Sequence, residues 1–210
     1  MPPPDPSLLA RLRNNSVGSF HPDGPPDQTP LISYRRLERH PLVIVVGIDP
    51  ETDYPGHPLA GIDLQRALEE RAYEVGGKNY DAPAQLVGDF LRDKASKELG
   101  AVIPSYKPGI RLCNLTEVLP PFAIAAIREA IPEFNKQIQG FSMNDAVLTA
   151  VETRTSSPIC IKRDSVSLQS INTKGLYPGG EGAGYAGGIL SAAVDGIKIA
   201  EAVAKDLLKI

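Results

Sequence analysis

The fold of this chain is decided by residues 175–191, which read Gly-Leu-Tyr-Pro-Gly-Gly-Glu-Gly-Ala-Gly-Tyr-Ala-Gly-Gly-Ile-Leu-Ser. This pattern predicts a short strand, a glycine loop and the start of a helix. Six of the ten residues from Gly179 to Gly188 are glycine, and each costs about 0.5–1 kcal/mol relative to alanine through lost chain entropy. Two explanations are open: backbone angles that other residues avoid, or a ligand whose close approach leaves no room for a Cβ atom.

The residues after the loop predict an amphipathic helix from Gly188 to Leu208, because apolar residues recur there at helical spacing. The apolar positions are Leu190, Val194, Ile197, Ala200, Ala204 and Leu207, and the polar positions between them include Ser191, Asp195, Lys198, Glu201, Lys205 and Lys209. Glycines before a helix leave its first N–H groups open to a ligand, and the helix dipole makes this end positive. An anion, typically a phosphate, is therefore expected there.

Glu181 refines the expected ligand. A carboxylate about 4 Å from a phosphate would cost on the order of 4 kcal/mol at an effective dielectric constant of 20, so Glu181 is predicted to accept hydrogen bonds from hydroxyl groups instead. The loop then suits a ligand that carries both a phosphate and a polyol. The alternative is a glycine-rich turn that packs the helix closely on a strand, with Glu181 in solvent.

Two motifs lie upstream of the loop. Residues 79–90 read Asn-Tyr-Asp-Ala-Pro-Ala-Gln-Leu-Val-Gly-Asp-Phe, and residues 152–158 read Glu-Thr-Arg-Thr-Ser-Ser-Pro. With the glycine loop, these motifs make the chain resemble the C-terminal half of uncharacterised FAD-dependent dehydrogenases, which are NAD(P)/FAD-dependent oxidoreductases of the glutathione-reductase type. The resemblance covers about residues 42–208. Members of that family begin with a strand, a Gly-x-Gly-x-x-Gly loop and a helix that hold the FAD diphosphate, and no such element precedes the motifs here.

The resemblance implies a FAD-dependent oxidoreductase (dehydrogenase), or the C-terminal part of one, with FAD as cofactor. It places Glu181 at the ribityl hydroxyls and the start of the last helix at the flavin pyrimidine or the diphosphate. The implied cofactor-binding residues are Gly179, Gly180, Glu181, Gly182, Gly187, Gly188 and Ile189. Hydride would come from NAD(P)H or from an organic substrate.

The polar segment at 154–157 lies between two predicted strands, at 146–153 and 159–162. In the family that the chain resembles, the chain crosses here from the substrate domain back to the FAD domain. The residues that this implies at the flavin and substrate face are Arg154, Thr155, Ser156 and Ser157. Arg154 would attract an anionic substrate or the reduced flavin, and the hydroxyls would bind the ring or substrate. The alternative is a plain turn.

The motif at 79–90 supplies candidate substrate residues. By the same resemblance, Asn79, Tyr80 and Gln85 would line a substrate cavity. Pro83 is predicted to open a helix, since proline suits the first helical position. The alternative is that the three polar residues cap and pack this helix.

The predicted fold class is α/β. Residues 1–40 are rich in proline and are predicted to be disordered. Residues 41–157 are expected to form an α+β substrate or insert domain, with a strand at 42–47 and helices at 63–75 and from Pro121. Residues 158–210 would then form the C-terminal strand and helix of a FAD-binding, Rossmann-like domain whose N-terminal half is missing.

Composition limits the function classes. A net charge of −3 over 210 residues argues against a broad nucleic-acid or anionic-membrane surface. No apolar run approaches the roughly 20 residues of a membrane span. The three histidines share no metal-ligand spacing, so no metal is expected. Cys113 and Cys160 form no Cys-x-x-Cys pair, which favours a cytoplasmic setting, with an organelle left open.

Two rivals to a complete oxidoreductase are kept. The chain is a non-catalytic fragment or a subunit that requires a separate FAD-domain partner chain or a homo-oligomer, or it is a phosphate and polyol binding module without redox activity. The missing diphosphate loop favours the first rival. Reduction of a bound flavin discriminates the second.

Overall fold

A computed structural model describes residues 30–35, 41–154 and 156–209. The chain divides into two compact units. Of the described residues, unit 1 contains 30–35, 41–47 and 64–153, and unit 2 contains 48–63, 154 and 156–209. The domain boundaries expected from the sequence, at 41–157 and 158–210, stay a prediction.

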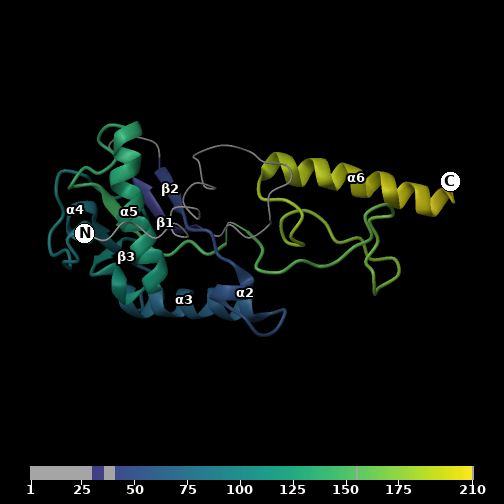
Figure 1. Cartoon of the computed structure of the whole chain (residues 1–210), viewed down its shortest axis with the longest axis horizontal. Coiled ribbons are helices and arrows are strands. Elements are labelled where there is room, and N and C mark those ends of the chain that lie inside the picture. Colours follow the sequence, from purple (N-terminus) through teal and green to yellow (C-terminus); the bar gives the residue numbers. More distant parts are fainter. Residues whose placement is uncertain (1–29, 36–40, 155, 210) are drawn as a thin grey trace. The chain divides into compact units, whose positions relative to one another are not determined.

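A mixed five-stranded sheet organises unit 1 (Figure 1). Its strands are β1 (Pro30–Arg35), β2 (Pro41–Val45), β3 (Ala82–Leu86), β4 (Ile110–Leu112) and β5 (Val147–Thr149). Their order is β2-β1-β5-β3-β4. Strands β3 and β4 are parallel and the other neighbours are antiparallel. Strand β1 lies within the segment predicted to be disordered, and the rest of that segment lies outside the described residues. The mixed α/β structure agrees with the α+β part of the predicted fold class.

The helices among the described residues are α2 (Pro50–Asp53), α3 (Ala60–Gly76), α4 (Val87–Leu91), the 3-10 helix η1 (Leu115–Glu117), α5 (Pro121–Gln137) and α6 (Ile189–Leu208). The predicted helix from Pro121 is confirmed as α5, in which proline occupies the first turn, where no N–H group is needed. The apolar face of α5 supplies much of the core, since Ala123, Ile127 and Ile131 are fully buried.

The helix predicted to begin at Pro83 is wrong. Residues 82–86 form the central strand β3, and helix α4 begins only at Val87. Carbonyl groups of β3 accept hydrogen bonds from both neighbouring segments, Pro83 from the N–H of Ala150 and Ala84 from the N–H of Cys113, each at 2.9 Å. Pairing on both edges therefore outweighs the local preference of proline for a helix start.

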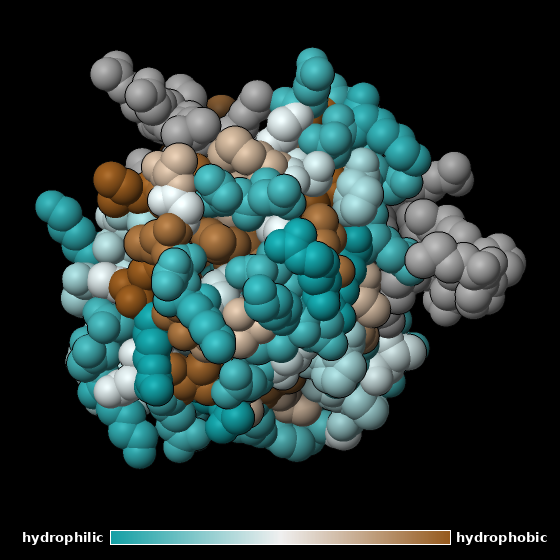
Figure 2. Space-filling view, turned by 90° about the vertical axis from the view of Figure 1, so that its left-hand side faces the viewer, coloured by the Kyte–Doolittle hydropathy of each residue, from teal (hydrophilic) through white to brown (hydrophobic). Residues whose placement is uncertain are grey.

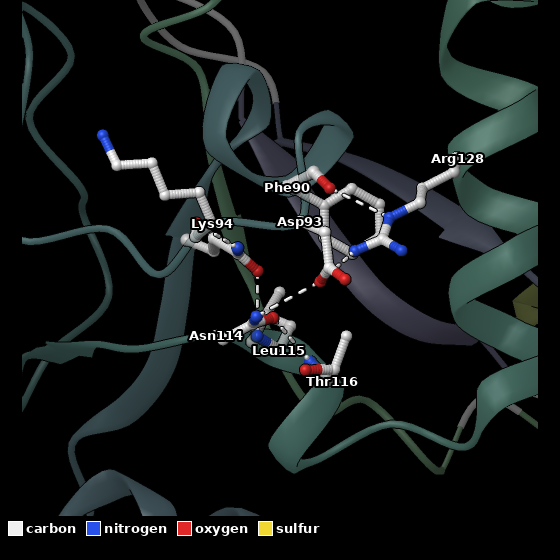
Figure 3. A network of polar contacts seen from close by, with 8 residues as sticks. Phe90, Asp93, Lys94, Asn114, Leu115, Thr116 and Arg128 are labelled. Carbon is white, nitrogen blue, oxygen red and sulfur yellow. Dashed lines mark hydrogen bonds and ion pairs between the residues drawn. The ribbon is translucent and has the colours of Figure 1, made fainter.

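A polar network ties α4, η1 and α5 together (Figure 3). The Arg128 guanidinium donates to the backbone oxygen of Phe90 at 2.9 Å and to a carboxylate oxygen of Asp93 at 2.7 Å. It also lies 5.2 Å from the centre of the Phe90 ring. The hydrogen bond from Arg128, followed by that from Asn114, lowers the pKa of Asp93. The network fixes the chain after α4, where Asp93 adopts a positive φ of 55°.

The described residues of unit 2 have little regular structure besides α2, the first turn of α3 and α6. Between residues 154 and 188 the described residues form one isolated bridge, Arg163 to Ser170, and the strand predicted at 159–162 is not formed. A lone strand has no neighbour to satisfy its ladder hydrogen bonds, which accounts for the difference. The predicted helix after the glycine loop is confirmed as α6. The Rossmann-like assignment of this region stays a prediction.

The surface carries hydrophobic patches among hydrophilic side chains (Figure 2). Exposed large hydrophobic residues of unit 1 include Leu99, Ile103 and Tyr106. Among the described residues, no helix is long and apolar enough to cross a membrane.

Candidate functional site

The glycine loop of unit 2 contains a compact turn. The N–H of Tyr185 donates to the carbonyl of Gly180 at 3.0 Å, and the N–H of Gly184 donates to the carbonyl of Glu181 at 2.9 Å. Gly180 and Gly184 have φ angles of 66° and 81°, which favour glycine. A Cβ atom on Gly184 would lie 2.7 Å from the carbonyl oxygen of Ile159. The turn itself therefore explains these two glycines.

Three other glycines have no such explanation among the described residues. Cβ atoms on Gly182 and Gly187 would have no neighbour within 4 Å, and one on Gly188 would meet only the Ser191 hydroxyl at 3.8 Å. None of the three has a positive φ, and Gly188 is fully extended at −175°. Among the described residues, neither the backbone angles nor the packing requires glycine at these three positions.

The N-terminus of α6 follows these glycines directly. Gly188 is the N-cap and provides no side-chain cap, and the first turn carries no acidic residue. The first N–H groups of a helix lack partners inside the helix, and the dipole makes this end positive. Residues 182–187 read Gly-Ala-Gly-Tyr-Ala-Gly, the spacing of dinucleotide-binding loops, which the sequence reasoning overlooked. The strand that precedes such loops is missing from the described residues.

Glu181 lies at the tip of the turn and is half-buried. In the part of the chain that the structure describes, its carboxylate makes no side-chain hydrogen bond or ion pair. Close by, the Ser157 hydroxyl lies 3.1 Å from the carbonyl oxygen of Gly182 and 2.9 Å from that of Ile159. Ser157 therefore contacts the glycine loop through the Gly182 carbonyl, and its role at a flavin or substrate stays a prediction.

The remaining candidates of the 154–157 segment are less informative. Arg154 is exposed and Ser156 is half-buried, and both make interactions within the chain. Thr155 lies outside the described residues. Their roles at a flavin or substrate stay predictions.

The candidate substrate residues belong to unit 1. Tyr80 is 71 % exposed, and its ring centre lies 5.1 Å from that of Tyr73. The Asn79 amide donates to a carboxylate oxygen of Asp81 at 2.9 Å. Both candidates are therefore accessible to a ligand from solvent.

Gln85 differs from the other two, because it is fully buried. Its amide nitrogen donates to the carbonyl of Lys94 at 2.8 Å, and its amide oxygen accepts from the N–H of Leu115 at 2.8 Å. Gln85 joins β3 to the segments that follow α4 and begin η1. The alternative reading of Gln85 as a packing residue has the more direct physical support, and the substrate role stays a prediction.

An ion pair between Arg163 and Asp195, which the sequence pattern does not predict, lies against the loop. Arg163 and Asp195 each expose 9 % of their side chains and form two hydrogen bonds, of 2.6 and 3.0 Å. The hydrogen bond from Arg163 is the main cause that lowers the pKa of Asp195. The two residues are 32 positions apart, and no spacing rule in a single sequence pairs them. The only signal is a charged residue at a position of α6 that the structure then buries.

This pair predicts an acid sensitivity of unit 2. Because the pKa of Asp195 is lower in the folded state, the stabilisation is complete above the ordinary value of 3.8 and is lost as the pH falls through the folded value. The melting temperature of the wild type is expected to fall more steeply below about pH 4 than the melting temperature of Asp195→Asn. Parallel curves of melting temperature against pH for the two proteins would contradict the assignment.

The cysteines give a second prediction. Burial raises the pKa of the Cys113 thiol to about 11, so little thiolate exists at neutral pH. Iodoacetamide at pH 8 is expected to label Cys113 slowly, as followed by peptide mass spectrometry. In denaturant the labelling should become fast, because the thiol is then solvated. Fast labelling of the folded chain would show that Cys113 is not shielded.

Comparison with known proteins defines the class. A model of the family "FAD-dependent protein, C-terminal domain-like" matches residues 35–155, and the chain belongs to this family. FAD is accordingly its cofactor, as expected from the sequence. The match ends before the glycine loop, so it does not assign that loop.

The chain is also similar to a longer protein. Over 167 residues the chain is 51% identical to an uncharacterized protein of Clostridium beijerinckii, a match that covers 80% of this chain and 31% of the relative. The chain therefore spans about a third of the length of this relative.

Proposed function

We propose that this chain supplies the flavin-contacting loop of a FAD-dependent oxidoreductase, with the loop at 179–189 as the contact. The observation that carries the proposal is the set of glycines at 182, 187 and 188, which neither backbone angles nor packing within the described chain require. Selection of glycine at such positions is explained by a ligand that approaches the backbone.

The residues present fit FAD. The open helix N-terminus suits a phosphate or the electron-rich edge of a flavin, and the carboxylate of Glu181 suits hydroxyl groups of a ribityl chain. When bound, FAD supplies the redox chemistry. In this proposal Glu181 orients the cofactor, and Arg154 with the hydroxyls of Ser156 and Ser157 draws an anionic substrate toward the same unit. NAD(P)H or an organic substrate is the proposed hydride donor.

Titration of the 210-residue chain with FAD, followed by flavin fluorescence, tests the proposal. Saturable binding is expected, and Glu181→Ala should weaken it, whereas Glu201→Ala on exposed α6 serves as a matched control. If FAD binds and neither substitution matters, the loop is not the contact.

A second candidate is a subunit or segment that binds FAD only together with a further FAD-domain part. Helix α6 favours it, because its apolar face is exposed while its buried residue is the charged Asp195. The exposed apolar residues are Ile189, Leu190, Val194, Ile197, Leu207 and Leu208, at 91, 79, 52, 62, 76 and 68 %. Burial of such side chains is worth about 1.5–3 kcal/mol each, so a covering partner is strongly favoured.

The part of the Clostridium beijerinckii relative that lies outside the aligned region is a ready probe. If this candidate holds, the chain alone should fail to bind FAD, and a mixture of the chain with that part of the relative should bind it. Ile197→Lys is expected to abolish FAD binding by the mixture, because it places a charge in the covered face, whereas Lys198→Arg should leave this binding unchanged. Assembly of the chain with itself, seen by analytical ultracentrifugation, would instead identify a homo-oligomer.

A phosphate and polyol binding module without redox activity is the remaining candidate. It predicts that FAD binds but that neither NADH nor NADPH bleaches the flavin absorption of the complex. Bleaching with either donor would exclude it.

A further inference from the structure

The buried ion pair in unit 2 contacts both ends of the turn at 180–185. On one side, a carboxylate oxygen of Asp195 accepts from the N–H of Gly180 at 2.8 Å, and the Arg163 guanidinium donates to the carbonyl of Pro178 at 2.8 Å. Asp195 lies on α6, so these bonds join the start of the loop to the helix that follows the loop.

Arg163 also contacts the other end of the turn. Its guanidinium carbon lies 3.7 Å from the centre of the Tyr185 ring, within the range of a cation–π contact. The N–H of Arg163 donates to the Tyr185 hydroxyl at 3.0 Å. One side chain therefore contacts Pro178 before the turn and Tyr185 at its end, and Glu181 and Gly182 lie between these two residues in the sequence.

We expect the Arg163–Asp195 ion pair to affect the order of the loop more than the free energy of unfolding of the chain. Replacing a buried ion pair by apolar residues of similar volume is often neutral or stabilising, because the desolvation of two charges offsets their attraction. Bonds to the N–H of Gly180 and the carbonyl of Pro178, in contrast, are directional and have no substitute in an apolar pair. The loop is thus the part that depends on these two residues.

We propose that Arg163 and Asp195 are positioning residues that hold the turn at 180–185 in its ligand-ready shape before FAD binds. The inference rests on the proposed function only for its ligand, since the contacts belong to the chain without ligand. Pre-organisation of this kind raises affinity because less ordering is left for the binding step.

The test compares the wild-type chain with the double variant Arg163→Met/Asp195→Leu, which removes both charges and keeps side-chain volume. Amide hydrogen exchange without ligand reports the loop, and thermal unfolding reports the fold. We expect loop amides around Gly180 to exchange at least about tenfold faster at a similar melting temperature. Unchanged exchange in the folded double variant overturns the proposal.

The FAD affinity of the same two proteins gives the second readout, measured with the partner segment present if the chain needs it. We expect about tenfold weaker binding by the double variant, and partial recovery with the single variant Arg163→Lys, which keeps the charge. Equal affinity of wild type and double variant overturns the positioning role. If the wild type binds no FAD in either form, the proposed function fails, while the exchange data still decide whether the pair orders the loop. Where the double variant fails to fold, Arg163→Lys alone carries both measurements.

Discussion

Replacing Gly188 with valine is expected to abolish FAD retention while unit 2 stays folded. A Cβ atom at this position meets only the Ser191 hydroxyl, at 3.8 Å, among the described residues, and the extended φ of −175° suits any residue. The side chain would occupy the space beside the first N–H groups of α6. Loss of two charge-assisted hydrogen bonds, at about 1.5–3 kcal/mol each, corresponds to at least about 100-fold weaker binding.

Gly196→Val is the matched control, because a Cβ atom on Gly196 also has no neighbour within 4 Å but lies two turns along the helix. Flavin content after purification, melting temperature and helical circular dichroism are compared for the three proteins. Unchanged flavin content in Gly188→Val would remove the start of α6 from the site. A loss shared by both variants would point to the helix rather than to the loop.

Replacing Gln85 with leucine is expected to destabilise unit 1 by about 1–3 kcal/mol, because the buried N–H of Leu115 loses its acceptor. The carbonyl of Lys94, on an exposed residue, can be hydrated instead. In a chain of this size the melting temperature should fall by about 2–4 °C for each kcal/mol. Denaturant unfolding followed by circular dichroism measures the change.

The exposed Gln139 provides the control, since Gln139→Leu removes the same amide without removing a buried contact. A Gln85→Leu protein that keeps its stability and loses only substrate turnover would support the substrate role instead. The result therefore separates the two readings of Gln85.

Helix prediction succeeded where a long periodic pattern and a defined start coincide. Helix α5 begins at Pro121 as predicted, and α6 follows the glycine loop. Strand β3 was missed because its sequence, Ala-Pro-Ala-Gln-Leu, has weak strand preference, and its conformation is imposed by partners at Ile110 and Thr149 that are distant in sequence.

The orientation of α6 could not be predicted from periodicity alone. An amphipathic pattern indicates which face needs cover but does not name the cover. In the structure the apolar face, including Ile197, is exposed, and Asp195 is buried against Arg163. The described residues of this chain therefore do not cover the apolar face that the pattern predicts to be buried.

The glycine loop shows what a sequence and a structure each contribute. The number of glycines in the sequence calls for an explanation, but the sequence alone does not show which of them the backbone of the turn requires and which it does not. The structure assigns Gly180 and Gly184 to the turn, and among the described residues it gives no reason for glycine at 182, 187 and 188. The proposal of a ligand therefore rests on the glycines at 182, 187 and 188 alone, because the backbone angles of the turn already require glycine at 180 and 184.

The most direct measurement is amide hydrogen exchange of the chain with and without saturating FAD, with the partner segment added if binding requires it. We predict that protection appears at Glu181, Gly182 and residues 187–191, where the cofactor would cover the backbone. Saturated FAD that leaves the exchange of these amides unchanged would contradict the central claim that the glycine loop holds the flavin cofactor.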